Sequence, residues 1–184
     1  IVKLAVEKIL KKNVLVVGAG IKTGLNIRID NPAQLGSDLV VDSVAAIVEY
    51  PAPLLIFDLG TANTVCVIDK NKNYIGGMIY PGIGVSLDSL TAHASQLGGI
   101  SIEAPEHMIG KNTTECMKSG LIYSSAAAMD GIIDRLQEQL GGEATVIATG
   151  GLAKKIVSHC RREIILDDDL LLKGLAIIYK KNRK

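Results

Sequence analysis

The chain has 184 residues, of which 48% are hydrophobic, and its 20 Lys and Arg nearly balance its 19 Asp and Glu, for a formal net charge of +1. This length and apolar content are enough for the core of one large or two small domains and exclude a disordered chain. The near-neutral charge gives no electrostatic reason to expect nucleic acid or an anionic membrane as a partner, so we expect a small molecule instead.

Short apolar runs and scattered cysteines exclude further classes. Runs such as residues 14–17 and 54–57 are far shorter than the ~20 residues that span a bilayer. The chain has three cysteines, an odd number, and Cys66, Cys116 and Cys160 lie far apart in the sequence. We therefore expect a cytoplasmic protein without disulfides or a zinc site.

The N-terminal part of the chain predicts a helix, a strand and a second helix. Apolar residues alternate with lysines at helical spacing over residues 2–10. Residues 14–17 form a run of Val and Leu that ends in Gly-Ala-Gly, which is typical of a strand buried on both faces. After the turn at Asn31-Pro32, residues 36–48 carry a stripe of Val and Ala that predicts a helix ended by Pro51 and Pro53.

The rest of the chain predicts a meander followed by alternating helices and strands. Three strand-like runs with short polar turns between them indicate adjacent antiparallel hairpins, at residues 54–58, 64–68 and 74–79. The elements expected next are a helix at 86–97, a loop at 98–112, a long helix at 114–140 closed by Gly141-Gly142, a strand at 146–148, a helix at 152–159, a strand at 164–166 and a helix at 170–179. This order favours an α/β fold with a mixed sheet.

Three glycine turns follow predicted strands. Residues 58–61 (Asp-Leu-Gly-Thr) put an acidic cation ligand beside backbone N–H groups and a hydroxyl that can hold phosphate, although an ordinary polar hairpin turn would look the same. Residues 149–151 (Thr-Gly-Gly) and 81–84 (Pro-Gly-Ile-Gly) are further turns that let a ligand approach the backbone. Together they indicate a nucleotide cleft.

The glycine-rich stretch at residues 18–24 fits neither common nucleotide motif. Its Gly-x-Gly-x-x-x-Gly spacing is one residue too long for a dinucleotide fingerprint. A Walker A motif requires Gly immediately before Lys, whereas Ile21 precedes Lys22.

Asp38 follows Gly36 and Ser37 at the start of the predicted second helix. Taken alone, Ser37 or Asp38 serves as a helix cap or complements the helix dipole. The set of motifs around Asp38 favours a functional role over a cap.

The ordered set GIKTGLNIR, NP, GSD, DLGTANT, GGMIYPGIGVSLDSL, IGKNT, SG and ATGGLA resembles type III pantothenate kinases along essentially the whole chain. The resemblance implies the α/β fold of the actin, sugar kinase and Hsp70 ATPase superfamily, in which two ribonuclease H-like halves with mixed sheets face a nucleotide cleft. Residues 1–52 would be the remainder of a truncated first half and residues 53–184 the second half. The implied reaction is ATP-dependent phosphorylation of pantothenate, the first step of coenzyme A biosynthesis.

The resemblance also implies a role for each matching residue. Asp38 matches the general base, and Asp58 matches a ligand of a monovalent cation, K⁺ or NH₄⁺. Mg²⁺ accompanies the ATP phosphates. Five residues match ATP contacts: Gly60, Thr61, Thr149, Gly150 and Gly151. Five fall where pantothenate is held: Gly36, Ser37, Asp38, Leu39 and Thr113.

Three positions depart from the family pattern. Leu39 stands where the family usually has Arg, Ile29 where it usually has Tyr, and Asn63 where it usually has Thr. Leu cannot replace the planar charged fork with which Arg binds a carboxylate such as that of pantothenate. Arg28 and Lys22 remain as possible substitutes.

The family also has an Asp-x-Gly-Asn-Thr turn that grips the ATP phosphates, N-terminal to the matching segment. The chain opens at Ile1 without an initiator Met and lacks this turn. We therefore expect residues 1–184 by themselves to bind ATP poorly and not to turn over.

Two other functions stay open from the sequence: a nucleotide-dependent regulator of the actin or Hsp70 kind, and a degenerate paralogue that serves in protein interactions. Asp38 argues against the regulator, because a protein that uses its nucleotide only as a conformational switch needs no general base beside a pocket for a phosphoryl acceptor. The resemblance further implies a homodimer, for which the small-residue stretch at 119–129 is a candidate surface; tight packing within one chain explains that stretch equally well.

Overall fold

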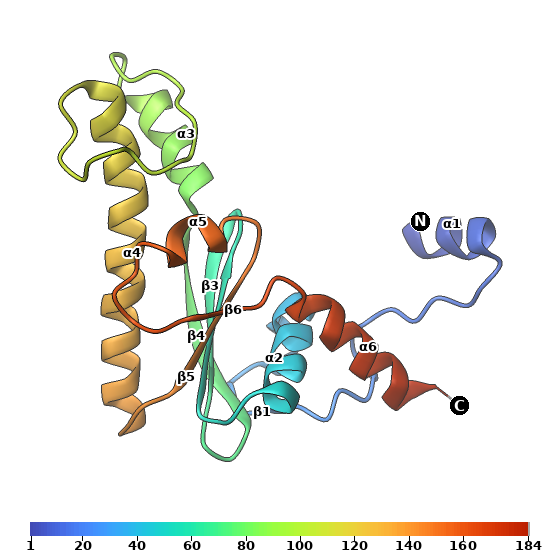
Figure 1. Ribbon diagram of the computed structural model, residues 1–184. Coiled ribbons are helices and arrows are strands. Elements are labelled where there is room, and N and C mark those ends of the chain that lie inside the picture. Colours follow the sequence, from blue (N-terminus) through green and yellow to red (C-terminus); the bar gives the residue numbers. More distant parts are fainter. Residues whose placement is uncertain (184) are drawn as a thin grey trace.

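The computed structural model describes residues 1–183 and has one six-stranded mixed sheet between two layers of helices (Figure 1). The strands stand in the order β1-β4-β3-β2-β5-β6. Their bounds are β1 Asn26–Ile27, β2 Leu54–Leu59, β3 Ala62–Ile68, β4 Asn73–Pro81, β5 Thr145–Thr149 and β6 Ile165–Leu166. The helices are α1 Val2–Leu10, α2 Ser37–Glu49, α3 Ile83–His93, α4 Thr113–Leu140, α5 Ala153–Val157 and α6 Leu170–Asn182, with a 3₁₀ turn at Pro32–Gln34.

Strand β2 is the central element of the sheet. It pairs antiparallel with β3 and parallel with β5. Leu54 and Ile56 point into the core beneath α2 and α6, whereas Leu55, Phe57 and Leu59 point into the core beneath α4. This double burial explains why the strand reads as a continuous apolar run.

The connections confirm the predicted fold class. An antiparallel meander, β2 to β4, is followed by helices and by two further strands, β5 and β6, that add in parallel beside β2. This is the arrangement of a ribonuclease H-like half of the actin-like ATPase fold. The division of the chain at residues 52 and 53 stays a prediction.

The helices cover the two faces of the sheet unequally. Helices α2 and α6 pack together on one face, and α4 lies along the other with α5 (Figure 1). The N-terminal end of α4 extends beyond the sheet, where α3 packs against it. Gly141, with φ 76°, ends α4 as predicted, and α3 begins inside the predicted turn at residues 81–84, with Gly82 as its N-cap.

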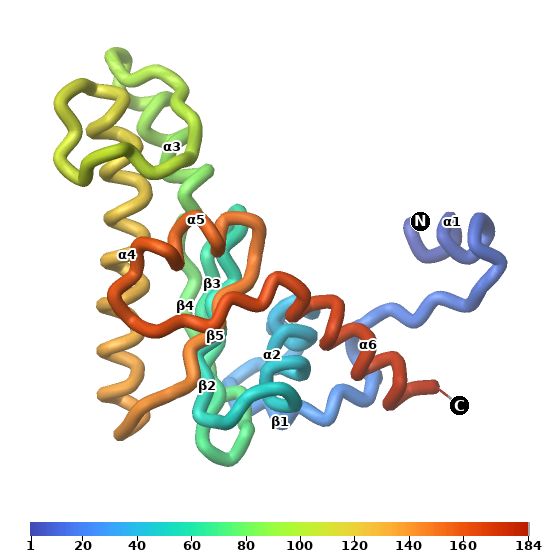
Figure 2. Tube along the Cα trace, in the orientation of Figure 1, coloured from blue at the N-terminus to red at the C-terminus, as the bar shows by residue number. Residues whose placement is uncertain are grey.

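The first 25 residues differ most from expectation. Helix α1 forms as predicted, but its nine residues are exposed or half-exposed and it lies apart from the sheet (Figure 2). The predicted strand at residues 14–17 is wrong: this segment is irregular because it meets no strand edge, and the Val14 amide is bound by the Glu7 carboxylate at 3.0 Å. The sheet instead gains the short strand β1, which pairs with β4 and is joined to it by an Asn26–Asn73 side-chain hydrogen bond of 2.6 Å.

No helix in the described residues is long and apolar enough to cross a membrane.

Gly174 allows α6 to approach the backbone of α2 closely. A Cβ at this position would overlap the carbonyl oxygen of Val41 and lie 2.7 Å from its Cγ1. Both residues are buried, and Val41 lies one residue before Asp42 on α2. The α2–α6 contact therefore fixes the helix that carries Asp38.

Gly174→Ala is expected to lower the free energy of unfolding by about 1–3 kcal/mol, because the added methyl forces α6 away from α2. Urea denaturation followed by circular dichroism measures the change. Gly131→Ala in α4 is the matched control: its Cβ would meet only the Arg135 guanidinium at 3.0 Å, the end of a flexible exposed side chain. The control should keep or slightly raise stability, since Ala favours a helix. Equal stability of the two variants would contradict the packing role of Gly174.

Candidate functional site

A pocket of about 610 Å³ lies at the carboxyl ends of the parallel strands β2 and β5. In open α/β sheets this edge is where ligands bind. The lining residues come from α2, β2, the end of β5 and the turn after it, α5, the connection between β6 and α6, and the start of α6: Asp38, Asp42, Asp58, Thr149, Gly150, Gly151, Lys154, Asp168 and Leu171. Five of the predicted site residues, Asp38, Asp58, Thr149, Gly150 and Gly151, therefore meet in one pocket.

Asp38 is the second residue of α2 and is exposed at the pocket. Its carboxylate folds back over the helix N-terminus so closely that a Cβ on Gly36 would collide with it. The positive end of the helix dipole favours a carboxylate there. Asp38 takes part in none of the ion pairs between described residues, so its oxygens are free to act on a ligand.

Asp58 is half-buried near the end of β2 and lies against the turn after β5. Gly150 has φ 97°, and a Cβ there would lie 2.5 Å from Asp58 Oδ1 and 2.7 Å from the amide nitrogen of Leu59. The Leu152 amide also donates to the Leu59 carbonyl at 3.3 Å. Only glycine combines this conformation with so close an approach, so the predicted glycine turn at residues 149–151 is packed directly on the predicted cation ligand.

Asp42 also lines the pocket, and sequence reasoning missed it. It lies one helical turn after Asp38, on the same face of α2, and only 2% of its surface is exposed. Its Oδ1 accepts no hydrogen bond from any described residue. Burial, and then the charges of Asp58, Asp38 and Asp167, raise the pKa of Asp42 to about 7. The signal in the sequence was an acidic residue at i+4 from Asp38 within an otherwise apolar stripe.

The pocket is acidic, so a further negative charge placed in it is energetically unfavourable. The pKa of Asp58 is raised by burial and by the nearby Asp38 carboxylate. Asp168 adds a fourth carboxylate at the lining, and Lys154 contributes a cation. Hard cations bound by oxygen ligands fit such a donor set.

Gly60, Thr61 and Thr113 lie outside this lining. Half-buried Gly60 and exposed Thr61 form the turn between β2 and β3, after Asp58 and Leu59 in the chain, and Gly82 packs against their carbonyl groups. Thr113 is the first residue of α4 and lines a separate hollow between α3 and α4. Within one chain, the structure therefore does not bring Thr113 to Asp38.

The unusual residues at two family positions are part of the core. Leu39 and Ile29 are half-buried and pack against the cluster beneath α2 and α6. Arg28 lies at the other end of the strands, near the turn after β3 that contains Asp69. Burial raises the pKa of Asp69, but hydrogen bonds from Asn73 and Asn71, and then the charge of Arg28, lower it below its ordinary value. Lys22 is held beside the end of α6 through its backbone amide, which donates to Asn182. Neither predicted substitute for the missing Arg lines the pocket.

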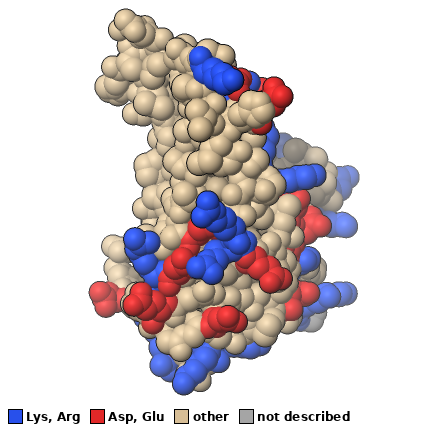
Figure 3. All heavy atoms as spheres, turned by 60° about the vertical axis from the view of Figure 1, so that its left-hand side comes forward, with Lys and Arg blue, Asp and Glu red and all other residues tan. Residues whose placement is uncertain are grey.

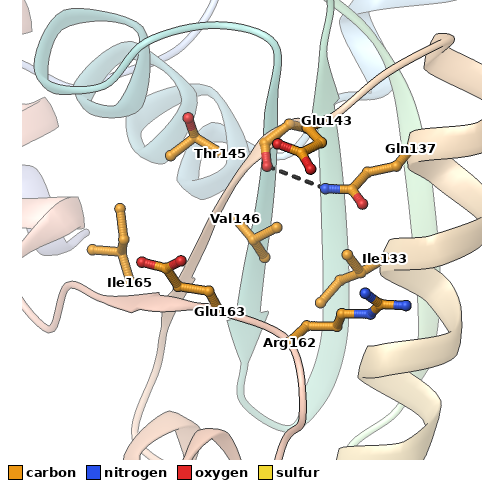
Figure 4. A pocket seen from close by; sticks show the side chains of 9 residues that line it. Ile133, Gln137, Glu143, Thr145, Val146, Arg162, Glu163 and Ile165 are labelled. Atoms are coloured by element: carbon orange, nitrogen blue, oxygen red, sulfur yellow. Dashed lines mark hydrogen bonds between the residues drawn. The ribbon is translucent and has the colours of Figure 1, made fainter.

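A second hollow of about 350 Å³ lies at the opposite end of β5 (Figure 4). The side chains of Val146 and Ile133 form its floor, and Gln137 donates to the Ala144 carbonyl at 3.3 Å across one side. Its Arg162 is already paired with Asp134 at 2.7 Å. The hollow contains none of the predicted site residues and lies at the amino end of the strand.

Comparison with solved structures supports the fold class. A Baf family protein from Campylobacter jejuni superposes with a TM-score of 0.55 at 22% identity, over 85% of this chain and 68% of that one. Ethanolamine utilization protein EutJ from Carboxydothermus hydrogenoformans superposes with a TM-score of 0.51 at 15% identity, over 96% of this chain and 70% of that one. The chain is thus an α/β protein of the actin-like ATPase fold.

Comparison of sequences identifies the family. The sequence model of type III pantothenate kinase matches residues 2–135. Curated type III pantothenate kinases from Bacillus cytotoxicus and Exiguobacterium sibiricum are 46% and 48% identical to the chain over 176 and 168 residues, or 96% and 91% of its length. The chain belongs to the type III pantothenate kinase family. It spans 67% and 66% of the length of these two relatives.

Gly150→Ala is expected to lower the free energy of unfolding by about 1–3 kcal/mol, because Ala at φ 97° is strained and its methyl strikes Asp58 and Leu59. Gly151→Ala is the matched control, since a Cβ at Gly151 meets no described atom within 4 Å. Urea denaturation of both variants measures the difference. A loss of equal size in both would contradict the close contact between Gly150 and β2.

Asp42 is expected to make the protein less stable as the pH rises. Its pKa is 3.8 in the unfolded chain and about 7 in the folded one, so the folded state retains a proton that the unfolded state has lost. Stability from this group is therefore full below pH 3.8 and decreases as the pH rises to about 7. In buffer without divalent cations, Asp42→Asn should raise the free energy of unfolding at pH 8 by roughly 1–4 kcal/mol.

Urea denaturation at a series of pH values tests this expectation. The difference between the variant and the unaltered protein should shrink steadily as the pH falls towards 5. A difference that does not change with pH would show that Asp42 ionises normally. Asp88→Asn, on the exposed surface of α3, is the control and should follow the unaltered protein.

Proposed function

We propose that the protein phosphorylates pantothenate to 4'-phosphopantothenate with ATP, the first step of coenzyme A biosynthesis. The main support is that Asp38, Asp58 and the glycine turn at residues 149–151 line one pocket in a chain of the type III pantothenate kinase family. We further propose that the enzyme acts in the cytoplasm.

Asp38 acts as the general base in this proposal. It lies at the pocket, is exposed, and shares no ion pair with a described residue. One carboxylate oxygen takes the proton from the primary hydroxyl of pantothenate while the hydroxyl oxygen attacks the γ-phosphorus of ATP. The bond from that phosphorus to the bridging oxygen breaks, and ADP leaves with the bonding electron pair.

The nucleotide lies along the two glycine turns in this proposal. Gly60 and Thr61 contact its phosphates, and residues 149–151 line the adenosine side, where the absence of side chains on Gly150 and Gly151 leaves the backbone accessible. Bound Mg²⁺ and a monovalent cation supply positive charge that offsets the charge of the phosphates. Asp58 is the ligand of the monovalent cation, K⁺ or NH₄⁺. Its half-buried carboxylate beside the buried, unpartnered Asp42 gives a donor set that fits a cation.

Pantothenate contacts residues 36–39 and Thr113 in this proposal. Because Thr113 of the same chain lines a different hollow, it reaches the substrate only if a second copy brings the N-terminal end of its α4 to the Asp38 pocket. Residues 119–129 of α4 contain no charged side chain, and the α4 side of the molecule shows an extended uncharged area above a belt of mixed charges (Figure 3). This area supports a homodimer, and a monomer in sedimentation equilibrium would contradict that part of the proposal.

Asp38→Asn is expected to lower pantothenate-dependent ADP release by at least about 100-fold, because Asn cannot accept the hydroxyl proton. The assay uses the product of the whole gene with ATP, Mg²⁺ and K⁺, and compares rates with and without pantothenate. Asp88→Asn removes a carboxylate far from the pocket lining and should leave the rate unchanged. ATP hydrolysis that does not depend on pantothenate, or an Asp38→Asn variant with full activity, would overturn the proposed reaction.

A further inference from the structure

Lys154 is the basic residue among the described residues that line the Asp38 pocket. The same lining contains four carboxyl groups, those of Asp38, Asp42, Asp58 and Asp168. Lys154 is exposed, and it takes part in none of the ion pairs between described residues. Its ammonium group is therefore available to an anion that enters the pocket.

The backbone of Lys154 is held firmly beside the end of β2. Lys154 is the second residue of α5, and Ala153 and Ile156 of the same helix are fully buried. The turn before α5 is joined to β2, because the Leu152 amide donates to the Leu59 carbonyl at 3.3 Å. A charged group on so fixed a backbone meets a ligand without rearrangement of the helix.

The next residue, Lys155, is turned away from the pocket. Its ammonium donates to the Ile102 carbonyl at 2.8 Å, in the loop between α3 and α4, and it does not belong to the pocket lining. Successive helical residues are rotated by about 100° from one another, so the two side chains leave α5 in different directions. Lys155 binds a loop of the chain itself, whereas Lys154 faces the pocket without a partner from the chain.

We propose that the Lys154 ammonium binds a phosphate oxygen of the nucleotide. The inference rests on the proposed kinase function and deepens it, since it adds a charged contact from α5 to the contacts of the two glycine turns. Lysine suits this role because its compact positive charge makes charge-assisted hydrogen bonds to phosphate. In a pocket otherwise lined by carboxyl groups, Lys154 supplies positive charge from the protein itself.

The place of Lys154 in the fold favours the nucleotide over the carboxylate of the acceptor. Lys154 follows Gly151 by three residues, so its side chain starts from the wall of the pocket that the glycine turn forms. Asp38 starts from α2, which forms another wall. In the proposed function the glycine turn lines the nucleotide, and residues 36–39 hold the acceptor.

The charge of Lys154 favours a phosphate over the adenosine part of the nucleotide. A charge-assisted hydrogen bond to phosphate is about twice as strong as one between neutral groups. An uncharged adenine ring attracts an ammonium only through its π face, and this attraction is weak where water is present. Removal of the Lys154 charge should therefore weaken the binding of nucleotides with phosphates but not that of adenosine.

The test compares the affinities of the whole gene product for ATP, ADP and adenosine, measured by isothermal titration calorimetry in Mg²⁺ and K⁺ without pantothenate. Lys154→Met should weaken ATP and ADP at least about tenfold and adenosine less than about twofold. Lys154→Arg keeps the positive charge and should retain most of the ATP affinity. Lys155→Met is the matched control and should bind all three compounds like the unaltered protein.

Thermal unfolding without ligand shows that each variant is folded. The Lys154 side chain is exposed, so both Lys154 variants should melt like the unaltered protein. Equal losses for ATP and adenosine, or unchanged ATP affinity in Lys154→Met, would each overturn the inference. A higher KM for pantothenate at unchanged ATP affinity would also overturn it, because it would assign the ammonium to the acceptor carboxylate.

The phosphate contact and the kinase reaction can fail separately. Pantothenate phosphorylation by a protein whose ATP affinity is unaffected by Lys154→Met would leave the proposed function standing and overturn the inference. ATP binding that depends on Lys154 in a protein that does not phosphorylate pantothenate would support the contact and overturn the proposed function.

Discussion

The burial of β2 on both faces is the constraint on which the rest of the molecule depends. One face of the strand receives α2 and α6, and the other receives α4. Because the strand is enclosed on both sides, its carboxyl end is the place where a polar side chain can leave the core, and Asp58 lies there. The same packing brings the N-terminal turn of α2, with Asp38, to the edge of the sheet at which Asp58 lies.

Close backbone contacts, rather than polar links between side chains, hold the pocket walls in place. Gly174 lets α6 pack onto α2 at Val41, and Gly150 lets the turn after β5 pack onto the end of β2. Each glycine removes the methyl group that would separate two elements carrying site residues. The positions of Asp38 and Asp42 relative to Asp58 are therefore set by main-chain packing, which leaves the carboxylates without partners from the chain.

Much of this arrangement could be predicted from the sequence, because its signals are local. The apolar runs of β2, β3 and β5 predicted the strands, Gly141 predicted the end of α4, and the glycine turns pointed to the pocket at the strand ends. The failures arose where a local pattern lacked its partner in space. Residues 14–17 have a strand-like composition but meet no strand edge, and the two residues of β1 are too few to give a periodic signal.

Asp42 shows a different limit of prediction from sequence. Its spacing from Asp38 was visible, but its burial depends on α6 and β2, which approach α2 from distant parts of the chain. Asp side chains are rarely buried, so from the sequence alone a single Asp among apolar helix residues is predicted to be exposed to solvent. Its burial becomes evident only when these neighbouring elements are known. The same is true of Leu39 and Ile29, whose contribution to the core appears only when α2 and the segment before it are packed on the sheet.

Two residues of α2 shift the electrostatics of the pocket in one direction. Leu39 packs half-buried against the core where the family usually has Arg, and Asp42 adds a buried carboxyl group on the same helix. Lys154 is the basic group at the lining, against Asp38, Asp42, Asp58 and Asp168. ATP and pantothenate are both anions, so a pocket with this charge would repel the substrates of the proposed reaction unless cations are bound first. In the proposed reaction we therefore expect bound cations to favour the entry of both substrates as well as to stabilise the transferred phosphoryl group.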